Sequence, residues 1–318
     1  MSAKNRTAFA KSVSLAAILL ATCGGFLSAE DGIMDFDTES AKSGKITQIE
    51  RSGADAVLSE MLKDTADSSH KILSATESAV TAIISVGGNN AVLSLGADSS
   101  KWIEKLPRVI RLLSDKKKSG EEIFSELSSS GIPLGEIPAS NKLSEINKAA
   151  PNVKSEFFRT KIFAGGCVNR VIVPETTFWI EIFGAEEIGF MAFMESSVMS
   201  IKLPAGVRKI GAFAFSRCFH IESVTIPDGT EILEKAAFHA CESLKSVKIP
   251  ASVREIEEEA FYWCLELESI EFSGTVAEWE SVKKGDGWNG EVPAKFVQCS
   301  DGKAELEGRD EEEENEPD

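Results

Sequence analysis

The stretch Val207-Arg-Lys-Ile-Gly-Ala-Phe-Ala-Phe-Ser-Arg-Cys218 returns in altered form at residues 230–241 and again at residues 253–264. Each copy begins 23 residues after the one before, and a proline closes the strand-like phrase that precedes it. The three prolines are Pro204, Pro227 and Pro250. A fixed period of this length predicts a repeat solenoid, in which each copy is one coil.

Apolar residues recur at the same places in every copy, so stacking the coils should merge them into one continuous core. Two of these columns contain Ile210, Leu233 and Ile256, and Phe215, Phe238 and Phe261. Residues 246–249 alternate polar and apolar side chains, which predicts a short strand, and stacked strands form a parallel sheet. About seven inward side chains at roughly 2 kcal/mol each cannot offset an ordering cost of roughly 1.5 kcal/mol per residue. A single coil therefore cannot fold alone, and the ends need caps, for which Trp279 and Trp288 are the candidates at the end of the repeats.

Three cysteines, Cys218, Cys241 and Cys264, also share one column. Equivalent side chains of neighbouring coils point the same way at about 4.8 Å, whereas a disulfide needs converging Cβ atoms at roughly 3.8 Å. The column is therefore interpreted as small buried residues without disulfides. Cys167 is expected to extend it.

The first coils are less regular. Residues 171–174, which end in Pro174, echo half a repeat, and an apparent insertion follows at residues 177–183. The solenoid with its closing cap is assigned to residues 160–302. After it, residues 303–318 are strongly acidic and nearly free of apolar side chains, which predicts a disordered tail.

Residues 51–150 show a different pattern. Apolar residues at Ala54, Leu58, Met61 and Leu62, and later around Ile72 and Val80, follow helical spacing, so this region is predicted to be helix-rich and of unknown family. The glycines at 87–88 are interpreted as a turn, because no phosphate-loop spacing of glycine and lysine accompanies them.

The chain begins with features of export. Lys4, Arg6 and Lys11 precede a short apolar stretch, which predicts that residues 1–22 are a signal peptide. Leu20-Ala21-Thr22-Cys23 resembles a bacterial lipoprotein box and makes Cys23 a candidate for lipidation; ordinary cleavage after Ala29 is the alternative. Residues 23–50 are interpreted as a flexible tether.

The sequence from Ile249 to Ile270 resembles the BspA-type (Treponema-type) leucine-rich repeat. The resemblance extends over about residues 162–302. The closing segments at 274–279 and 299–302 are similar to those that end many such proteins. Members of this family are commonly exported or surface-attached bacterial proteins, and some act as adhesins toward host matrix proteins or other bacteria. The resemblance thus implies a cell-surface protein-binding role.

The outward positions of the predicted strands form polar columns on one sheet face, which is the candidate partner-binding surface. Its residues are Lys202, Glu222, Thr225, Lys245, Lys248, Glu268 and Glu271. Alternating charges at 222, 245 and 268 have two interpretations, since such pairs either support the stack or contact a partner. The three lysines favour an acidic patch on that partner.

Composition excludes other classes. With 318 residues and a net charge of -17, the chain lacks the clustered lysine and arginine of a nucleic-acid-binding protein. Its three histidines, His70, His220 and His239, match no metal-binding or nucleophile motif. No cofactor, metal site or enzymatic activity is expected; an enzyme would have to reside in residues 51–150.

The sequence therefore favours an exported protein at the cell surface or on the outer membrane as a lipoprotein, with a periplasmic or secreted location as the alternative. In the main hypothesis the repeats bind a host matrix protein or a bacterial surface protein. In the alternative, the protein is a structural or scaffolding envelope lipoprotein whose repeats are a spacer.

Overall fold

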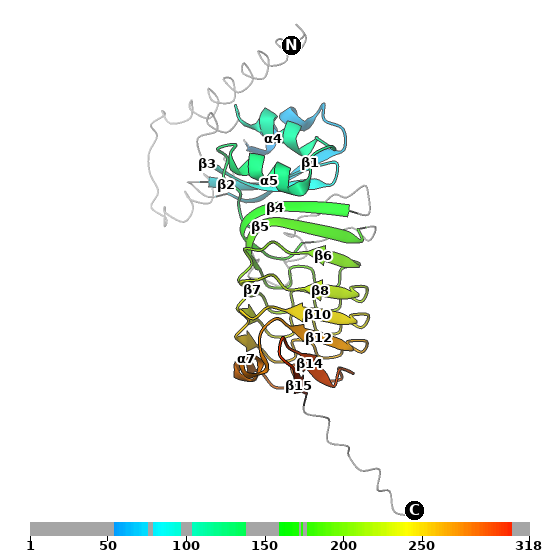
Figure 1. Cartoon of the computed structure of the whole chain (residues 1–318). Coiled ribbons are helices and arrows are strands. Elements are labelled where there is room, and N and C mark those ends of the chain that lie inside the picture. Colours follow the sequence, from blue (N-terminus) through cyan, green and yellow to red (C-terminus); the bar gives the residue numbers. More distant parts are fainter. Residues whose placement is uncertain are drawn as a thin grey trace, which may run out of the picture.

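The computed structural model describes residues 54–75, 79–96, 104–137, 159–171, 173 and 177–306. An α+β unit lies at one end of a stack of coils, and the coils close at the other end with a small cap (Figure 1). The predicted signal peptide, the tether and Cys23 lie outside the described residues, as do residues 307–318 of the predicted tail.

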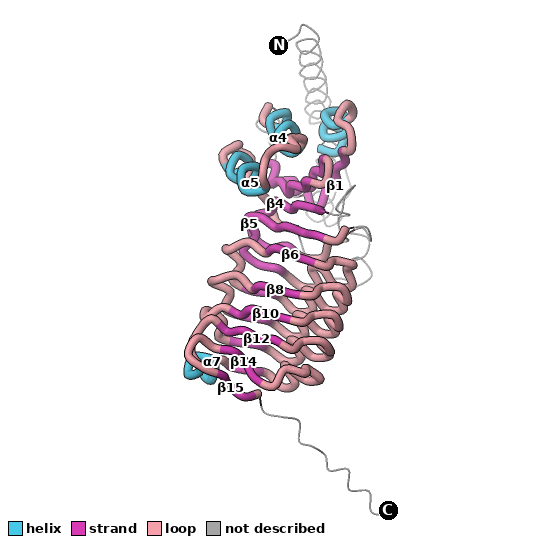
Figure 2. Tube along the Cα trace, turned by 45° about the vertical axis from the view of Figure 1, so that its right-hand side comes forward, coloured by secondary structure: helices cyan, strands magenta, loops and turns pink. Residues whose placement is uncertain are grey.

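Each regular coil contributes one front strand and one back strand. The front strands are β6 (Ser200–Lys202), β8 (Ser223–Thr225), β10 (Ser246–Ile249), β12 (Ser269–Phe272) and β14 (Phe296–Gln298). The back strands are β7 (Lys209–Ile210), β9 (Ile232–Leu233), β11 (Glu255–Ile256) and β13 (Lys283–Lys284). The parallel register aligns Ser246 with Ser223 and Ser269, which confirms the 23-residue period (Figure 2).

The first two coils use long strands instead. β4 (Arg159–Val168) and β5 (Trp179–Ile188) pair in parallel along their length. The start of β5 pairs with the front strand β6 and its end pairs with the back strand β7. One strand therefore runs across both faces without the proline turn, which shortens the coil: Arg159 pairs with Trp179, 20 residues on.

This arrangement corrects two expectations. Residues 177–183 are not an insertion, because most of them form the front part of β5. Val171 does not begin a strand end either: its N–H donates to the Ala192 carbonyl at 2.8 Å, just as the Phe193 N–H donates to the Ala214 carbonyl at 2.7 Å. Val171 therefore occupies the phenylalanine column, one coil before Phe193.

The phenylalanine column is the centre of the core. Ring centroids lie 5.5 Å apart for Phe193 and Phe215, 5.1 Å for Phe215 and Phe238, and 5.3 Å for Phe238 and Phe261, with nearly parallel planes. All four side chains are fully buried. The predicted continuous core is confirmed.

The cysteine column is confirmed as well. The thiols of Cys218, Cys241 and Cys264 are buried and free, and they donate to the carbonyls of Phe193, Phe215 and Phe238 at 3.1, 3.1 and 3.2 Å. Ser196 begins this column, with its Oγ 3.3 Å from the Cys218 sulfur. The expectation for Cys167 is wrong, because it lies within β4 and pairs with Glu187 in register.

The amino-terminal unit contains more strand than predicted. β1 (Ser68–Ala75), β2 (Ala79–Val86) and β3 (Asn89–Gly96) form an antiparallel sheet. Helices occupy residues 54–62, α4 (Leu106–Leu113) and α5 (Gly120–Ser128). The helix-rich prediction is therefore wrong for residues 68–75 and 79–96. β2 is buried on both faces, and a continuous apolar run does not show the alternation that separates strand from helix.

The predicted turn at residues 87–88 joins β2 to β3, with φ of 53° at Gly87 and 85° at Gly88. β3 then pairs in parallel with β4, so that Asn89 lies opposite Lys161. A single ten-stranded sheet consequently runs from the amino-terminal unit into the back of the solenoid. Above it, the Phe163, Phe183 and Phe124 rings stack at 5.1 and 6.4 Å, so α5 closes the open end of the first coils.

The other end carries its own cap. Helix α7 (Val276–Ser281) starts with a capping box between Thr275 and Glu278. Trp279 and Trp288 are buried over the last coil as predicted, and Trp288 meets Phe261 edge-on at 6.3 Å. The tail begins later than expected, because β15 (Lys303–Glu305) pairs antiparallel with β14 and buries Ala304 between polar neighbours.

Replacing Phe238 with alanine should lower the free energy of unfolding by about 3–5 kcal/mol, since it removes a fully buried ring between two stacked partners. Chemical denaturation with matched slopes measures this change. Phe190→Ala is the control, because Phe190 is 39% exposed and should cost less than about 1 kcal/mol. Equal losses in both variants would contradict the stacked core.

The buried thiols should be unreactive in the folded protein. Burial raises the pKa of Cys218 to about 11 and that of Cys241 well above 9, so the reactive thiolate is scarce at pH 8. In a Cys23→Ser chain, a chromogenic disulfide reagent should titrate Cys218, Cys241 and Cys264 only after denaturation. Rapid native labelling of Cys241 would contradict the structure.

Candidate protein-binding surface

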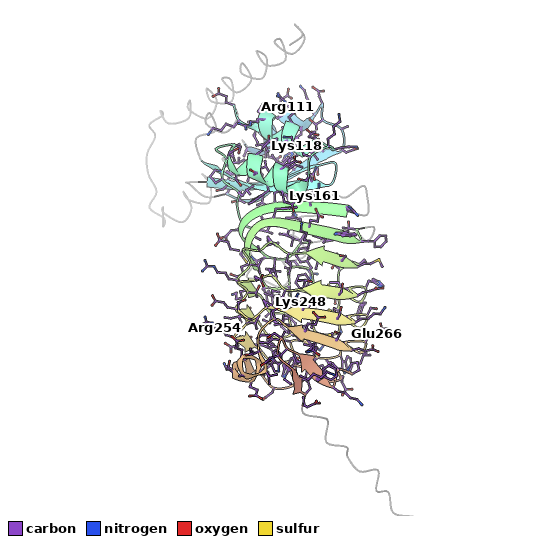
Figure 3. The ribbon with its side chains drawn as sticks, in the orientation of Figure 1. Arg111, Lys118, Lys161, Lys248, Arg254 and Glu266 are labelled. Atoms are coloured by element: carbon purple, nitrogen blue, oxygen red, sulfur yellow. The ribbon has the colours of Figure 1, made fainter. Side chains whose placement is uncertain are left out.

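The front strands expose every second side chain, so the predicted polar columns exist. Burial alternates along β8, β10 and β12 with valine or isoleucine inward. In register, Lys248 lies between Thr225 and Glu271, and Lys248 projects from the middle of the front face (Figure 3). The candidate residues Lys202, Glu222, Thr225, Lys245, Lys248, Glu268 and Glu271 are all exposed.

The column that contains Lys202, Thr225, Lys248 and Glu271 extends further at both ends. Gln298 pairs with Glu271, and toward the amino-terminal unit Lys202 pairs with Glu181, which pairs with Lys161. A search at 23-residue spacing misses Lys161 and Glu181, because the first two coils are shorter.

In the column formed by Glu222, Lys245 and Glu268, opposite charges lie at the outer limit of an ion pair. The Lys245 Nζ lies 3.9 Å from a Glu222 oxygen and 3.9 Å from a Glu266 oxygen. The second acidic neighbour is therefore Glu266, which the sequence pattern did not single out, and not Glu268. All three side chains are more than half exposed, and exposed pairs of this kind contribute little to stability.

Lys202 holds two parts of the molecule together. Its Nζ lies 2.7 Å from a carboxylate oxygen of Glu121 on α5 and 5.9 Å from the centre of the Phe183 ring. The hydrogen bond between the two groups raises the pKa of Lys202 and lowers that of Glu121. Of the three lysines of the predicted surface, Lys202 thus has a structural role already.

Large apolar side chains lie along one edge of the front face. Trp179 starts β5, Met199 precedes β6, and Phe219 and Leu265 each come four residues before a front strand. These four residues, here named the apolar margin, are 39, 45, 42 and 53% exposed. Figure 3 shows the neighbouring Glu266 at this edge.

Sequence reasoning missed the apolar margin because it looked for columns that repeat. Phe219, Glu242 and Leu265 occupy equivalent places in three coils. Because one coil carries glutamate at this place, the apolar residues of the other two coils are not needed for packing. The difference in chemistry between equivalent positions is the sequence signal that would have found the apolar margin.

The histidines do not assemble a catalytic or metal site. His70 lies on β1, with its Nε2 3.0 Å from the Oδ1 of Asp55, whereas a helix was expected there. His239 stacks on Tyr262 and Trp263, and its partial burial lowers its pKa. Within the described residues there is no group of three or more metal-ligating side chains, and no helix there is long and apolar enough to cross a membrane.

The repeats match a known protein family. Residues 159–282 match the BspA type leucine-rich repeat region in six copies. This segment is a BspA-type leucine-rich repeat. The resemblance drawn from the sequence is confirmed there, and so is the solenoid fold with its parallel sheet.

Three solved leucine-rich repeat proteins are similar to part of this chain. A leucine-rich cell surface protein of Faecalibacterium prausnitzii is 26% identical, with a TM-score of 0.34 over 42% of this chain and 34% of that one. A Bacteroides ovatus leucine-rich repeat protein is 22% identical (TM-score 0.34; 44% and 36%). A T. pallidum leucine-rich repeat protein is 20% identical (TM-score 0.35; 45% and 73%). The chain thus spans about a third of the first two proteins, and no curated protein matches it.

Breaking the contact between Lys202 and Glu121 should destabilise the protein only slightly. A double-mutant cycle with Lys202→Met and Glu121→Gln should give a coupling of about 0.2–1 kcal/mol at neutral pH, as for exposed pairs. Because the folded pKa of Glu121 lies below its ordinary 4.5, the coupling is present above that pH and is lost as the pH falls through the lowered pKa. A coupling of zero at pH 7 would contradict the assignment.

Proposed function

We propose that this chain is an exported bacterial surface protein whose front face, together with the apolar margin, binds another protein. The observation that carries the proposal is the apolar margin, where four large side chains remain exposed beside an ordered sheet. Burying such side chains gains about 25 cal/mol per Å² of apolar area, and aromatic residues are enriched among those that dominate protein interfaces.

The charged columns beside the margin support the same function. Lys245 and Lys248 are exposed cations, Lys245 near Glu222 and Lys248 beside Glu271. Such charge patterns orient a partner and reject wrong ones more than they add affinity. Because the strands are hydrogen-bonded to their neighbours, the surface is presented with little loss of conformational freedom, which favours binding. An acidic patch on the partner fits the two lysines.

The proposed location is the cell surface, with attachment through a lipid on Cys23. The supports are the charge order of residues 1–22, the sequence before Cys23 and the membership of residues 159–282 in the BspA-type repeats. Host matrix proteins and surface proteins of other bacteria are the proposed partner classes.

The alternative, an envelope lipoprotein with the repeats as a spacer, calls for a test by point variants. Deleting residues 51–150 would strip β3 from β4 and expose the edge of the solenoid sheet. A loss of binding after that deletion would report unfolding as readily as a lost contact.

Phe219→Ser with Leu265→Ser should weaken binding to the partner at least tenfold, because the apolar margin is then polar. The measurement is solid-phase binding of the mature chain to immobilised host matrix proteins and whole bacterial cells. Phe190→Ser is the matched control, since Phe190 is similarly exposed but packs against Phe213 on a different turn.

A second variant tests the charges separately. Lys245→Glu with Lys248→Glu should weaken binding and reduce its dependence on salt. Unchanged binding in both double variants, or no partner in either class, would overturn the proposed surface and leave the spacer role.

A further inference from the structure

Three aromatic side chains lie together on two neighbouring turns of the solenoid, the later of which leads into β12 (Figure 1). The ring centroids lie 5.7 Å apart for His239 and Tyr262, 6.4 Å for His239 and Trp263, and 6.0 Å for Tyr262 and Trp263. Their planes are inclined by only 16°, 29° and 17°. Trp263 is 50% exposed, more than any other phenylalanine, tyrosine or tryptophan of the described residues.

Packing of the core does not explain the tryptophan. The Trp263 N–H donates to the Gly290 carbonyl at 3.0 Å, as the Ala240 and Arg217 N–H groups each donate to the next coil at 2.8 Å. The three residues therefore hold equivalent places, where a methyl group or a cation serves as well. Trp263 also has a φ of 61°, which a bulky side chain rarely adopts. The hydrogen-bonded turn thus holds a large ring at the surface that the fold itself does not need.

Elsewhere in this protein, aromatic rings are covered by cations of the chain itself. Arg159 lies 4.4 Å from the centre of the Trp179 ring, and the other pairs are Lys202 with Phe183 at 5.9 Å, Lys284 with Trp279 at 4.6 Å and Lys303 with Phe296 at 3.6 Å. Among the described residues no lysine or arginine lies over the Trp263 ring in this way. Tryptophan attracts cations more strongly than the other aromatic residues do, so Trp263 can accept a cation from outside the chain.

The coil that carries Trp263 is strongly acidic. Residues 253–272 contain seven glutamates and one arginine, a formal charge of -6, whereas residues 230–252 contain three acidic and three basic side chains. Burial lowers the pKa of His239 below 6.5, against the opposing effect of the nearby Glu259 carboxylate, so this ring is uncharged at pH 7. Cations are therefore attracted to the three rings, and anions are repelled.

We propose that the surface formed by His239, Tyr262 and Trp263 binds a quaternary ammonium group, as in choline, over the open face of Trp263. A quaternary ammonium group has no N–H to hydrate, so it loses less on leaving water than a lysine-type ammonium, which is strongly hydrated. Its methyl groups also make apolar contact with the rings, and recognition of this group by aromatic side chains is well suited to the cation–π interaction. The proposal is independent of the protein-binding surface, since it uses no residue of the apolar margin.

The test is a titration of the full chain with choline at constant ionic strength, followed by the methyl NMR signal of the ligand. Saturable binding with a dissociation constant on the order of 1–10 mM is expected, as for a cation on an exposed ring. The uncharged carbon analogue of choline, 3,3-dimethyl-1-butanol, has the same shape and should bind at least about tenfold more weakly, because it lacks the cation. Equal binding of the two compounds, or no saturation by choline, would overturn the proposal.

Variants locate the site. Trp263→Ala should weaken choline binding at least about tenfold, whereas Trp263→Phe should retain part of it because a smaller ring remains. Trp179→Ala is the matched control and should leave binding unchanged, since Arg159 already covers that ring. If Trp263→Ala lowers the Tm, Glu259→Gln decides, and it should weaken choline binding without affecting the uncharged analogue. Wild-type affinity in Trp263→Ala, or an equal loss in Trp179→Ala, would contradict the assignment.

A further comparison identifies the source of the group. Vesicles of phosphatidylcholine present it on a lipid headgroup, whereas choline presents it free. Co-sedimentation of the wild-type chain, but not of Trp263→Ala, with these vesicles would assign the group to the headgroup. Choline binding without co-sedimentation would assign it to a free cation, and co-sedimentation that does not compete with choline would count against the proposed site.

Discussion

The parallel hydrogen bonding between coils determines almost everything else in this structure. It places equivalent residues of successive coils about 4.8 Å apart, so each position in the repeat becomes a column with one environment. Phenylalanine rings then stack at 5.1–5.5 Å, and buried thiols each find a carbonyl of the preceding coil. A charged residue in an inward column would disturb two neighbours at once, so the inward columns hold apolar or small polar residues such as Ser196, and the charges lie in the outward columns.

A stack of this kind has two ends, and each end has to hide a core and satisfy a sheet edge. At the carboxyl end, Trp279 and Trp288 cover the last phenylalanine and β15 pairs with β14. At the amino end, β3 pairs with β4 while α5 brings Phe124 onto Phe183. The amino-terminal unit is therefore a cap that shares one sheet with the repeats, and Lys202 adds a polar contact to the same junction.

The predictable part of the fold was the part where columns repeat. Phe215, Phe238 and Cys241 were placed correctly because their neighbours at 23-residue spacing have the same chemistry. The 23-residue spacing does not hold in the first coils, because a front strand that continues directly into a back strand needs fewer residues. The position of Cys167 was predicted wrongly for that reason. β2 was taken for helix because it is buried on both faces. Of the candidate surface, exposure was predictable from alternation, but the partner of Lys202 was not: Glu121 is 81 residues away in sequence.

The net negative charge of this protein disfavours partners that carry many negative charges. A polyanion approaching the surface meets the field of a chain of net charge -17, which is repulsive over about 8 Å at physiological salt. An acidic background of this kind disfavours polyanionic partners, and for the protein partner proposed at the apolar margin, apolar contact contributes more than net charge.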